Sequence, residues 1–173
     1  MKKSFWPLFF LILLASSFKS TSDLQDGTTL VRVGEIAPDF TAYTLDGKKI
    51  KLSGLQGKVV LINFFATWCG PCLREMPELE KDIWQPYKDK GLVILAVGRE
   101  ETREKLLPFI EQRKITFPVL PDPDRTIYAS FAKQYIPRNF LIGKDGRVVY
   151  SSIGYTREGF SALTRHVKEA LAR

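Results

Sequence analysis

Trp68-Cys69-Gly70-Pro71-Cys72 contains the only two cysteines of this 173-residue chain, with two residues between them. The pentapeptide follows an apolar run at residues 59–65 (VVLINFF), which is typical of a strand covered on both faces. A helix is expected after Pro71, so the cysteines should lie at a strand-to-helix turn. A helix N-terminus carries partial positive charge and free N–H groups, and both stabilise a thiolate. Because the thiolate is the form that attacks disulfides, the pair is predicted to be redox-active.

A structural disulfide is the alternative use of these cysteines. A bridge across only two intervening residues closes a very small loop, so it would constrain the unfolded chain far less than a long-range bridge. Its position at a strand-to-helix corner also favours reactivity over a structural role.

Composition indicates one ordinary globular domain. Hydrophobic residues make up 45% of the chain, and 26 Lys and Arg stand against 19 Asp and Glu, for a net charge of +7. Apart from Lys2 and Lys3 the basic residues are scattered among acidic ones. Since no basic stripe interleaved with aromatic residues occurs, nucleic acid is not expected as a partner.

The N-terminus is typical of an export signal. Two lysines are followed by an apolar run at residues 5–15 and by small residues at 15–17 (ASS). The run is shorter than the roughly 20 apolar residues of a bilayer span, so residues 1–20 are predicted to be a signal peptide. An uncleaved anchor is the alternative, and a lipid anchor is excluded because no cysteine follows the run directly. We expect a flexible lead over 21–33, a domain over 34–173, and a periplasmic or cell-envelope location.

The rest of the chain alternates strands and helices. A hairpin is expected around Asp46-Gly47, and the early strands should be parallel and the last two antiparallel. Asp124 is predicted to cap a helix that ends near Lys133. The other expected elements are a helix at 71–90 kinked at Pro77 and broken at Pro86, strands at 92–97, 117–120, 140–142 and 148–150, and helices at 102–114 and 157–172.

Several motifs together resemble one protein family. They are residues 37–40 (APDF), 45–48 (LDGK), 63–72 (NFFATWCGPC), 75–77 (EMP), 135–137 (YIP) and 140–142 (FLI). On these residues, the chain from about 34 to 171 is similar to the thioredoxin superfamily and, more narrowly, to exported TlpA/ResA-type thiol-disulfide oxidoreductases. The resemblance implies an α/β, thioredoxin-like fold, in which helices flank a central mixed β-sheet. It also implies an N-terminal β-hairpin and an insertion, here residues 99–124, before the cis-proline region.

The same resemblance implies roles for residues around the cysteines. Cys69 and Cys72 would form a redox-active disulfide, with Cys69 as the attacking thiol. A cis peptide bond before Pro137, facing the cysteines, would leave the Ile136 backbone free to bond an extended substrate. The stretch at 134–136 (QYI) lacks a glycine that is common there in relatives. The predicted substrate-binding residues are Trp68, Gly70, Pro71, Ile136 and Pro137.

One polar residue inside the apolar run separates this chain from plain thioredoxins. Thioredoxins carry a buried aspartate six residues before the first cysteine, and this chain has Asn63 there. The TlpA/ResA pattern instead has a glutamate three residues after the second cysteine, which is Glu75 here. On a helix Cys72 and Glu75 share a face, so a buried Glu75 could exchange a proton with Cys72. The alternative is a solvated acid in the first helical turn.

The predicted activity is reduction of disulfides in exported proteins by dithiol–disulfide exchange. The Gly70-Pro71 dipeptide resembles that of reducing thioredoxins, since the strongly oxidising type carries a histidine there. The expected partners are disulfide-containing proteins and a membrane-embedded electron donor. Association with the inner membrane through an uncleaved N-terminus remains an alternative, and no cofactor or metal is predicted.

Other functions stay open at this stage. A net oxidant or isomerase would use the same cysteines. A thiol peroxidase shares the entry at 37–40 but needs a threonine where this chain has Ala66. A copper chaperone of the same fold could bind metal through the pair, and a module could bind without turnover; a lone C-x-x-C is a poor zinc site. His166 is not expected to be catalytic, and Trp84 is expected in the core.

Overall fold

The structure is a computed structural model that describes residues 27–173. The predicted signal peptide at 1–20 and residues 21–26 of the predicted lead lie outside the described residues. Within the described range, no helix combines the length and apolar character that a bilayer span needs.

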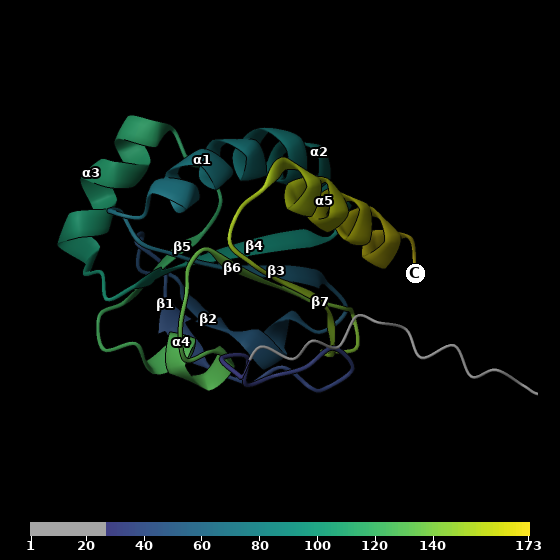
Figure 1. Cartoon of the computed structure of the whole chain (residues 1–173). Coiled ribbons are helices and arrows are strands. Elements are labelled where there is room, and N and C mark those ends of the chain that lie inside the picture. The colour runs from purple at the N-terminus through teal and green to yellow at the C-terminus, as the bar shows by residue number, and fades with distance from the viewer. Residues whose placement is uncertain (1–26) are drawn as a thin grey trace, which may run out of the picture.

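A five-stranded mixed sheet forms the centre of the domain (Figure 1). Its order is β5-β4-β3-β6-β7, and β3 pairs in parallel with β4, as β4 does with β5. The β6 strand runs antiparallel to both β3 and β7. The strands are β3 (Val59–Phe65), β4 (Leu92–Arg99), β5 (Val119–Asp122), β6 (Arg138–Ile142) and β7 (Val148–Ile153). The parallel and antiparallel halves agree with the sequence prediction.

Two apolar layers cover the faces of this sheet. Every residue of β3 is buried, which explains why its sequence does not alternate between apolar and polar residues and is apolar except at Asn63. On one face, Leu61 and Phe65 pack with Met76 and other residues of the helices above the sheet. On the other face, Ile62 and Phe64 pack against α4 and the hairpin. Figure 1 shows α1, α2, α3 and α5 on the first side of the sheet, and α4 with β1 and β2 on the second.

The helical run after the cysteines reaches Lys90, as the sequence predicts. It is built from α1 (Gly70–Glu78), the π-helical turn η2 (Leu79–Trp84), α2 (Gln85–Tyr87) and the 3-10 turn η3 (Lys88–Lys90). Pro77 lacks the N–H that would bond the Leu73 carbonyl, and Arg113 Nη1 lies 3.4 Å from that oxygen instead. The predicted break at Pro86 is wrong. The chain stays helical there because η2 changes the hydrogen-bond spacing just before that proline.

The remaining elements lie close to their predicted positions. The fifth strand starts at Val119 rather than 117, after Pro118, which has no N–H to donate to a ladder. The others are β1 (Thr41–Tyr43), β2 (Lys49–Lys51), the 3-10 turn η1 (Leu52–Leu55), α3 (Arg103–Arg113), α4 (Thr126–Phe131) and α5 (Arg157–Ala172).

The start of α4 corrects one prediction. Asp122, not Asp124, bonds the free N–H groups at this end: its carboxylate accepts from Ile127 N at 3.0 Å and Tyr128 N at 2.9 Å. The helix ends at Phe131 rather than Lys133, because Ala132 has an extended backbone and forms a bridge with Thr29.

Residues 28–33, within the predicted lead, pair with the end of α4. The Leu30 N–H donates to Phe131 O, and the Lys133 N–H donates to Thr28 O. Val31 is buried in the core beside α4. These contacts attach residues 28–33 to the domain, although the predicted domain boundary at residue 34 leaves them outside it.

Replacing Asp122 with alanine should lower the free energy of unfolding by about 1–2 kcal/mol, because two buried N–H groups lose their acceptor. The measurement is urea unfolding at neutral pH. The matched control is Asp124→Ala, two residues away and exposed, which should leave stability unchanged. Equal losses in the two variants would contradict the assignment of the cap.

Candidate functional site

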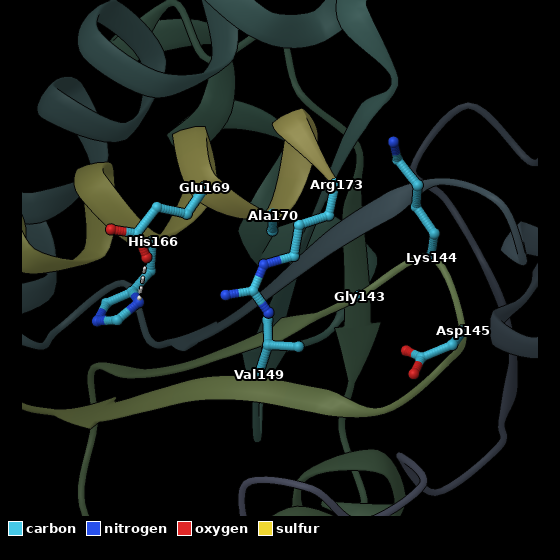
Figure 2. A pocket seen from close by; sticks show the side chains of 8 residues that line it. All are labelled: Gly143, Lys144, Asp145, Val149, His166, Glu169, Ala170 and Arg173. Carbon is cyan, nitrogen blue, oxygen red and sulfur yellow. Dashed lines mark ion pairs between the residues drawn. The ribbon is translucent and has the colours of Figure 1, made fainter.

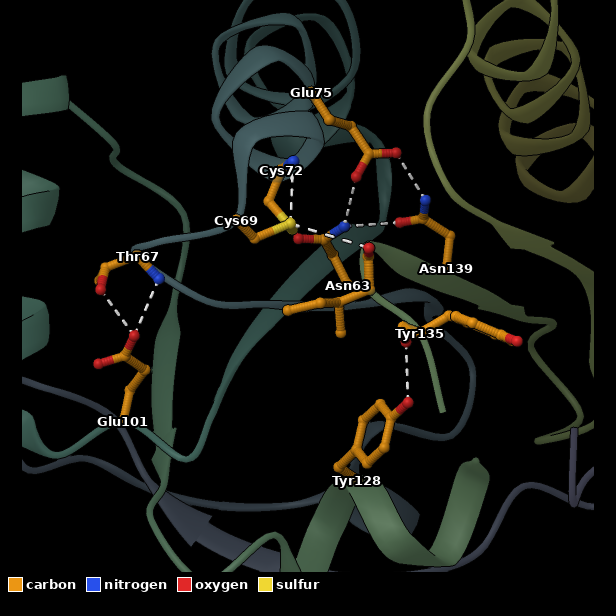
Figure 3. The surroundings of a disulfide bond; sticks show 10 residues. Asn63, Thr67, Cys69, Cys72, Glu75, Glu101, Tyr128, Tyr135 and Asn139 are labelled. Atoms are coloured by element: carbon orange, nitrogen blue, oxygen red, sulfur yellow. Dashed lines mark hydrogen bonds between the residues drawn. A yellow bond between two sulfur atoms is a disulfide. The ribbon is translucent and has the colours of Figure 1, made fainter. Parts of the chain in front are cut away.

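The two cysteines form a disulfide at the N-terminus of α1 (Figure 3). Their Cα atoms are 5.3 Å apart, and Cys69 is the N-cap residue of the helix. The Cys72 N–H points to Cys69 Sγ at 3.3 Å. Cys69 keeps 5% of its surface exposed and Cys72 none, so only Cys69 can be approached from solvent. A helix N-terminus with an N–H directed at Cys69 favours the thiolate of that residue once the disulfide is reduced.

A buried glutamate anchors the loop that leads into the pair. Glu101 follows β4 and is 1% exposed. Its Oε1 accepts hydrogen bonds from the Thr67 backbone N–H at 2.9 Å and the Thr67 hydroxyl at 2.6 Å. The sequence prediction missed this contact. The sequence did contain a signal for it: Glu101 is an acid just after the carboxyl end of a buried parallel strand. The carboxyl ends of neighbouring parallel strands lie side by side, so such an acid lies near the end of β3.

Trp68 lies on the surface directly before the first cysteine, and it is 65% exposed. The Arg99 guanidinium lies 5.7 Å from the centroid of its ring and 5.2 Å from that of the buried Tyr128. The exposed indole is therefore held beside the cysteines by a cation that also contacts the core.

The segment before β6 forms the other side of the site. The Ile136–Pro137 peptide bond is cis, as the family resemblance implied. The Ile136 carbonyl oxygen lies 3.8 Å from Cys69 Sγ. Pro137 is buried and Ile136 is half-buried. Tyr135 has φ of 70°, and its carbonyl accepts a hydrogen bond from the Tyr128 hydroxyl at 2.8 Å.

Three buried polar side chains meet beside the cysteines, as Figure 3 shows. Asn63 Nδ2 donates to Glu75 Oε2 at 2.9 Å and to Asn139 Oδ1 at 2.8 Å. Asn139 Nδ2 donates to Glu75 Oε1 at 2.7 Å. All three residues are at most 2% exposed, so Glu75 is not a solvated acid of the first helical turn. The sequence indicated Asn63 and Glu75 but not Asn139.

Burial changes the proton affinity of this carboxyl group. Removal from water raises the pKa of Glu75 from its ordinary 4.5 to about 7, while the hydrogen bonds from Asn139 and Asn63 oppose the rise. Both partners are neutral amides, so no positive charge compensates the carboxylate. Glu75 can therefore gain or lose a proton near neutral pH, which suits an acid or base.

His166 and Trp84 lie apart from this site. His166 stacks on Tyr150 at 4.4 Å and lies 3.4 Å from Glu169. It lines a pocket of about 250 Å³ between α5 and the β6–β7 turn, with Lys144 and Arg173 (Figure 2). Trp84 is half-buried at the edge of the core, and its indole donates to Thr116. Within residues 27–173, no group of three or more His, Cys, Asp and Glu residues is arranged to hold a metal ion.

Known proteins resemble this chain in both sequence and architecture. Residues 33–151 match the AhpC/TSA family. A thiol-disulfide oxidoreductase ResA of Bacillus cereus is 40% identical over 124 residues, which cover 72% of this chain and 71% of that protein. The ResA of Halalkalibacterium halodurans is 32% identical over 151 residues, or 86% and 85% of the two chains.

Solved structures of thiol-disulfide exchange proteins have a similar fold. A Bacteroides thetaiotaomicron protein proposed to be a protein disulfide isomerase has a TM-score of 0.81 and 41% identity, over 84% of this chain and 94% of that chain. A thioredoxin-family thiol:disulfide interchange protein of Chlorobium tepidum has a TM-score of 0.70 and 27% identity, over 82% and 98%. The predicted thioredoxin-like fold is therefore confirmed.

Replacing Glu75 with glutamine should flatten the pH dependence of stability. Between pH 4.5 and about 7 the unfolded chain loses this proton while the folded chain keeps it, so wild-type stability falls as pH rises and levels off above 7. The wild-type loss from this group is on the order of 3 kcal/mol. Urea unfolding at pH 4.5 and 8 measures the difference.

The control for this prediction is Glu111→Gln, which removes an exposed acid from α3. Its pH profile should run parallel to that of the wild-type protein. A Glu75→Gln profile that also runs parallel to the wild-type profile would show that the carboxyl titrates in its ordinary range.

Proposed function

We propose how disulfide exchange proceeds in this chain, which belongs to the AhpC/TSA family and is a thiol-disulfide oxidoreductase of the ResA type. Its substrates contain disulfide bonds. In our proposal Cys69 attacks the substrate, Cys72 resolves the intermediate, and the chain acts outside the cytoplasm as a reductase. The observation that carries the cysteine roles is their unequal position at the start of α1.

The reaction balances as a two-electron exchange. The Cys69 thiolate attacks one sulfur of the substrate disulfide, forming a mixed disulfide and releasing the other sulfur as a thiolate. Cys72, deprotonated, then attacks Cys69 Sγ, which forms the Cys69–Cys72 bond and releases the second substrate sulfur. The two cysteines are oxidised and the substrate disulfide is reduced. The Cys72 proton ends on one substrate sulfur, and the other substrate thiolate takes from solvent the proton that Cys69 released when it ionised.

Glu75 is the proposed proton acceptor for Cys72. Cys72 is fully buried, so its thiol has no direct contact with bulk water as a base. Glu75 lies one helical turn further along α1, and burial brings its pKa to about 7. A carboxyl group with that pKa can accept the thiol proton in the second step and return it to the departing thiolate.

Substrate contacts are proposed on both sides of Cys69. The carbonyl of Ile136, 3.8 Å from Cys69 Sγ, is placed to bond an extended chain laid across the cysteine. Trp68 offers an exposed aromatic surface, and the buried Pro137 restricts the backbone next to Ile136. Gly70 and Pro71 are exposed at the start of the helix, so a substrate can approach the disulfide closely there.

The segments before the domain support export. We propose that residues 1–20 direct the chain out of the cytoplasm, to the periplasm or cell envelope, and are then removed. Retention of the segment as an anchor would instead tie the protein to the inner membrane. N-terminal sequencing of the protein recovered from cells distinguishes a cleaved from an uncleaved chain.

A thiol peroxidase is the weaker alternative within the same family. It requires a threonine at the position of Ala66, which is a fully buried methyl side chain here. No hydroxyl is therefore available at that position to orient a peroxide.

The direction of electron flow should be reductive. Since Gly70-Pro71 resembles the dipeptide of reducing thioredoxins, we expect a reduction potential nearer to the roughly −270 mV of thioredoxin than to the roughly −120 mV of DsbA. Equilibration with glutathione or dithiothreitol redox buffers measures it. A potential close to the second value would assign a net oxidant. A reductase outside the cytoplasm needs electrons, and we propose a membrane-embedded donor that reduces Cys69–Cys72.

Replacing Cys72 with alanine should trap substrates as mixed disulfides through Cys69, because the resolving thiol is missing. The measurement is non-reducing electrophoresis of protein recovered from cells, with identification of the captured partners. Cys69→Ala is the matched control, and it should trap few or none because Cys72 is fully buried. The reverse result, with adducts only in Cys69→Ala, would exchange the two roles.

A further inference from the structure

We propose that Tyr135 selects the substrate, by binding an apolar or aromatic side chain next to the disulfide of a polypeptide. This inference rests on the proposed function, since it names the kind of polypeptide that reaches Cys69. Tyr135 would act as a specificity determinant and take no part in the exchange between sulfurs.

The backbone of Tyr135 adopts a conformation that L-residues rarely hold. Its φ of 70° lies in the left-handed region, which glycine occupies without a steric penalty. Among residues 27–173 three other non-glycine residues share this region, and all are charged: Glu100, Lys114 and Arg125. Tyr135 is the only aromatic residue of this set. A bulky ring at a position that suits glycine needs a reason.

The surrounding structure holds this conformation in place. The Tyr128 hydroxyl donates to the Tyr135 carbonyl at 2.8 Å. Tyr128 is fully buried, its ring meets Phe64 edge-on at 5.2 Å, and the guanidinium groups of Arg99 and Arg125 lie 5.2 Å and 5.4 Å from its centroid. The buried Tyr128 side chain thus holds the backbone of the exposed Tyr135 in place.

Packing within the domain does not explain the ring itself. Tyr135 is 57% exposed, and within the described part of the chain its phenol makes no hydrogen bond and its ring no aromatic or cation contact. The fold therefore fixes the backbone of Tyr135 while leaving its side chain in solvent. An exposed aromatic side chain whose backbone is fixed beside a reactive group is suited to contact a partner.

Its place relative to the cysteines defines what it can contact. The next residue is Ile136, whose carbonyl lies 3.8 Å from Cys69 Sγ. Figure 3 shows the Tyr135 side chain directed away from the cysteine pair, so it does not cover the disulfide. A small disulfide at Cys69 would not reach this ring, whereas a polypeptide laid along Ile136 would extend over it.

The other exposed aromatic residue next to the pair, Trp68, belongs to the same network. Arg99 lies over both the Trp68 ring and the Tyr128 ring, and Tyr128 in turn holds Tyr135. Two exposed aromatic residues therefore lie next to the residues that meet the substrate sulfur. Aromatic rings favour apolar and aromatic side chains, which is why we assign that chemistry to the residue flanking the substrate cysteine.

The test compares two synthetic peptides with reduced wild-type protein. Each peptide contains one internal disulfide, and they differ only in a Phe or a Ser beside the cysteine that is attacked. The small disulfide DTNB has no polypeptide chain to extend over Tyr135, so it reports on the exchange at Cys69 without that contact. We expect the reduced wild-type protein to react with the Phe peptide with a second-order rate constant about tenfold above that for the Ser peptide.

Variants at position 135 separate the ring from the backbone. Tyr135→Phe keeps the ring and should keep the preference. Tyr135→Asn loses the ring but tolerates the left-handed conformation, and it should abolish the preference while DTNB reduction is unchanged. Tyr43→Ala is the matched control, because Tyr43 is also 57% exposed but lies on β1, and it should behave as wild type.

Several outcomes would overturn the assignment. A Phe preference that survives in Tyr135→Asn, or an equal slowing of DTNB and peptide reduction, would contradict it. Tyr135→Gly should melt no lower than wild type, and a fall of several degrees would mean that the ring stabilises the fold. Wild-type protein that reduces DTNB but neither peptide would instead contradict the proposed reductase function, a result distinct from loss of selectivity alone.

Discussion

A carboxyl group without a counter-charge is the constraint on which the site depends. Glu75 is 2% exposed, and its hydrogen bonds come from the amides of Asn63 and Asn139. Two neutral amides stabilise a carboxylate less than bulk water does, so burial raises the pKa of Glu75 to about 7. This three-residue cluster needs three elements in fixed register. The β3 strand contributes Asn63, β6 places Asn139 directly opposite it, and α1 brings Glu75 over the sheet. The helix that carries the two cysteines is thereby positioned by the same residues that set the pKa of the proposed proton acceptor.

All groups of the site gather at one edge of the sheet. The parallel strands β3 and β4 end there, which places the Cys69 loop beside Glu101, and the antiparallel β6 begins there, after Pro137. This topology explains why residues distant in sequence act together: Glu101 holds Thr67, and Ile136 meets Cys69. Sheet pairing sets the distances between these groups, and the cysteines lie at the start of α1, directly after the loop that leaves β3.

The sequence predicted what local pattern determines and missed what depends on register. The apolar run of β3, the helix at Arg157–Ala172 and the cysteine pair have strong local signatures. Asn139 has no such local signature, because it matters only through its position opposite Asn63 on the neighbouring antiparallel strand. The register of these two strands cannot be deduced from the lengths of the turns. The prediction of Asp124 as the cap failed for a related reason. Both acids precede α4, and only the backbone path shows which one faces its N–H groups. The attachment of residues 28–33 is likewise a long-range pairing, with α4 and the segment after it, that composition cannot reveal.

Chemistry and selection are assigned to different sides of this edge, and the physical basis of each differs. On the β3–α1 side, desolvation and the helix N-terminus act on charge, so substitutions there change proton and electron transfer. On the β6 side, Tyr135 keeps a strained backbone and an exposed ring, neither of which bears on the charge of a sulfur. Two neutral groups of the β6 side contact the reactive residues. The Ile136 carbonyl lies next to Cys69, and the Asn139 amide lies next to Glu75. The side chain of residue 135 can therefore change without altering the reactive pair, provided that the backbone of residue 136 keeps its place beside Cys69.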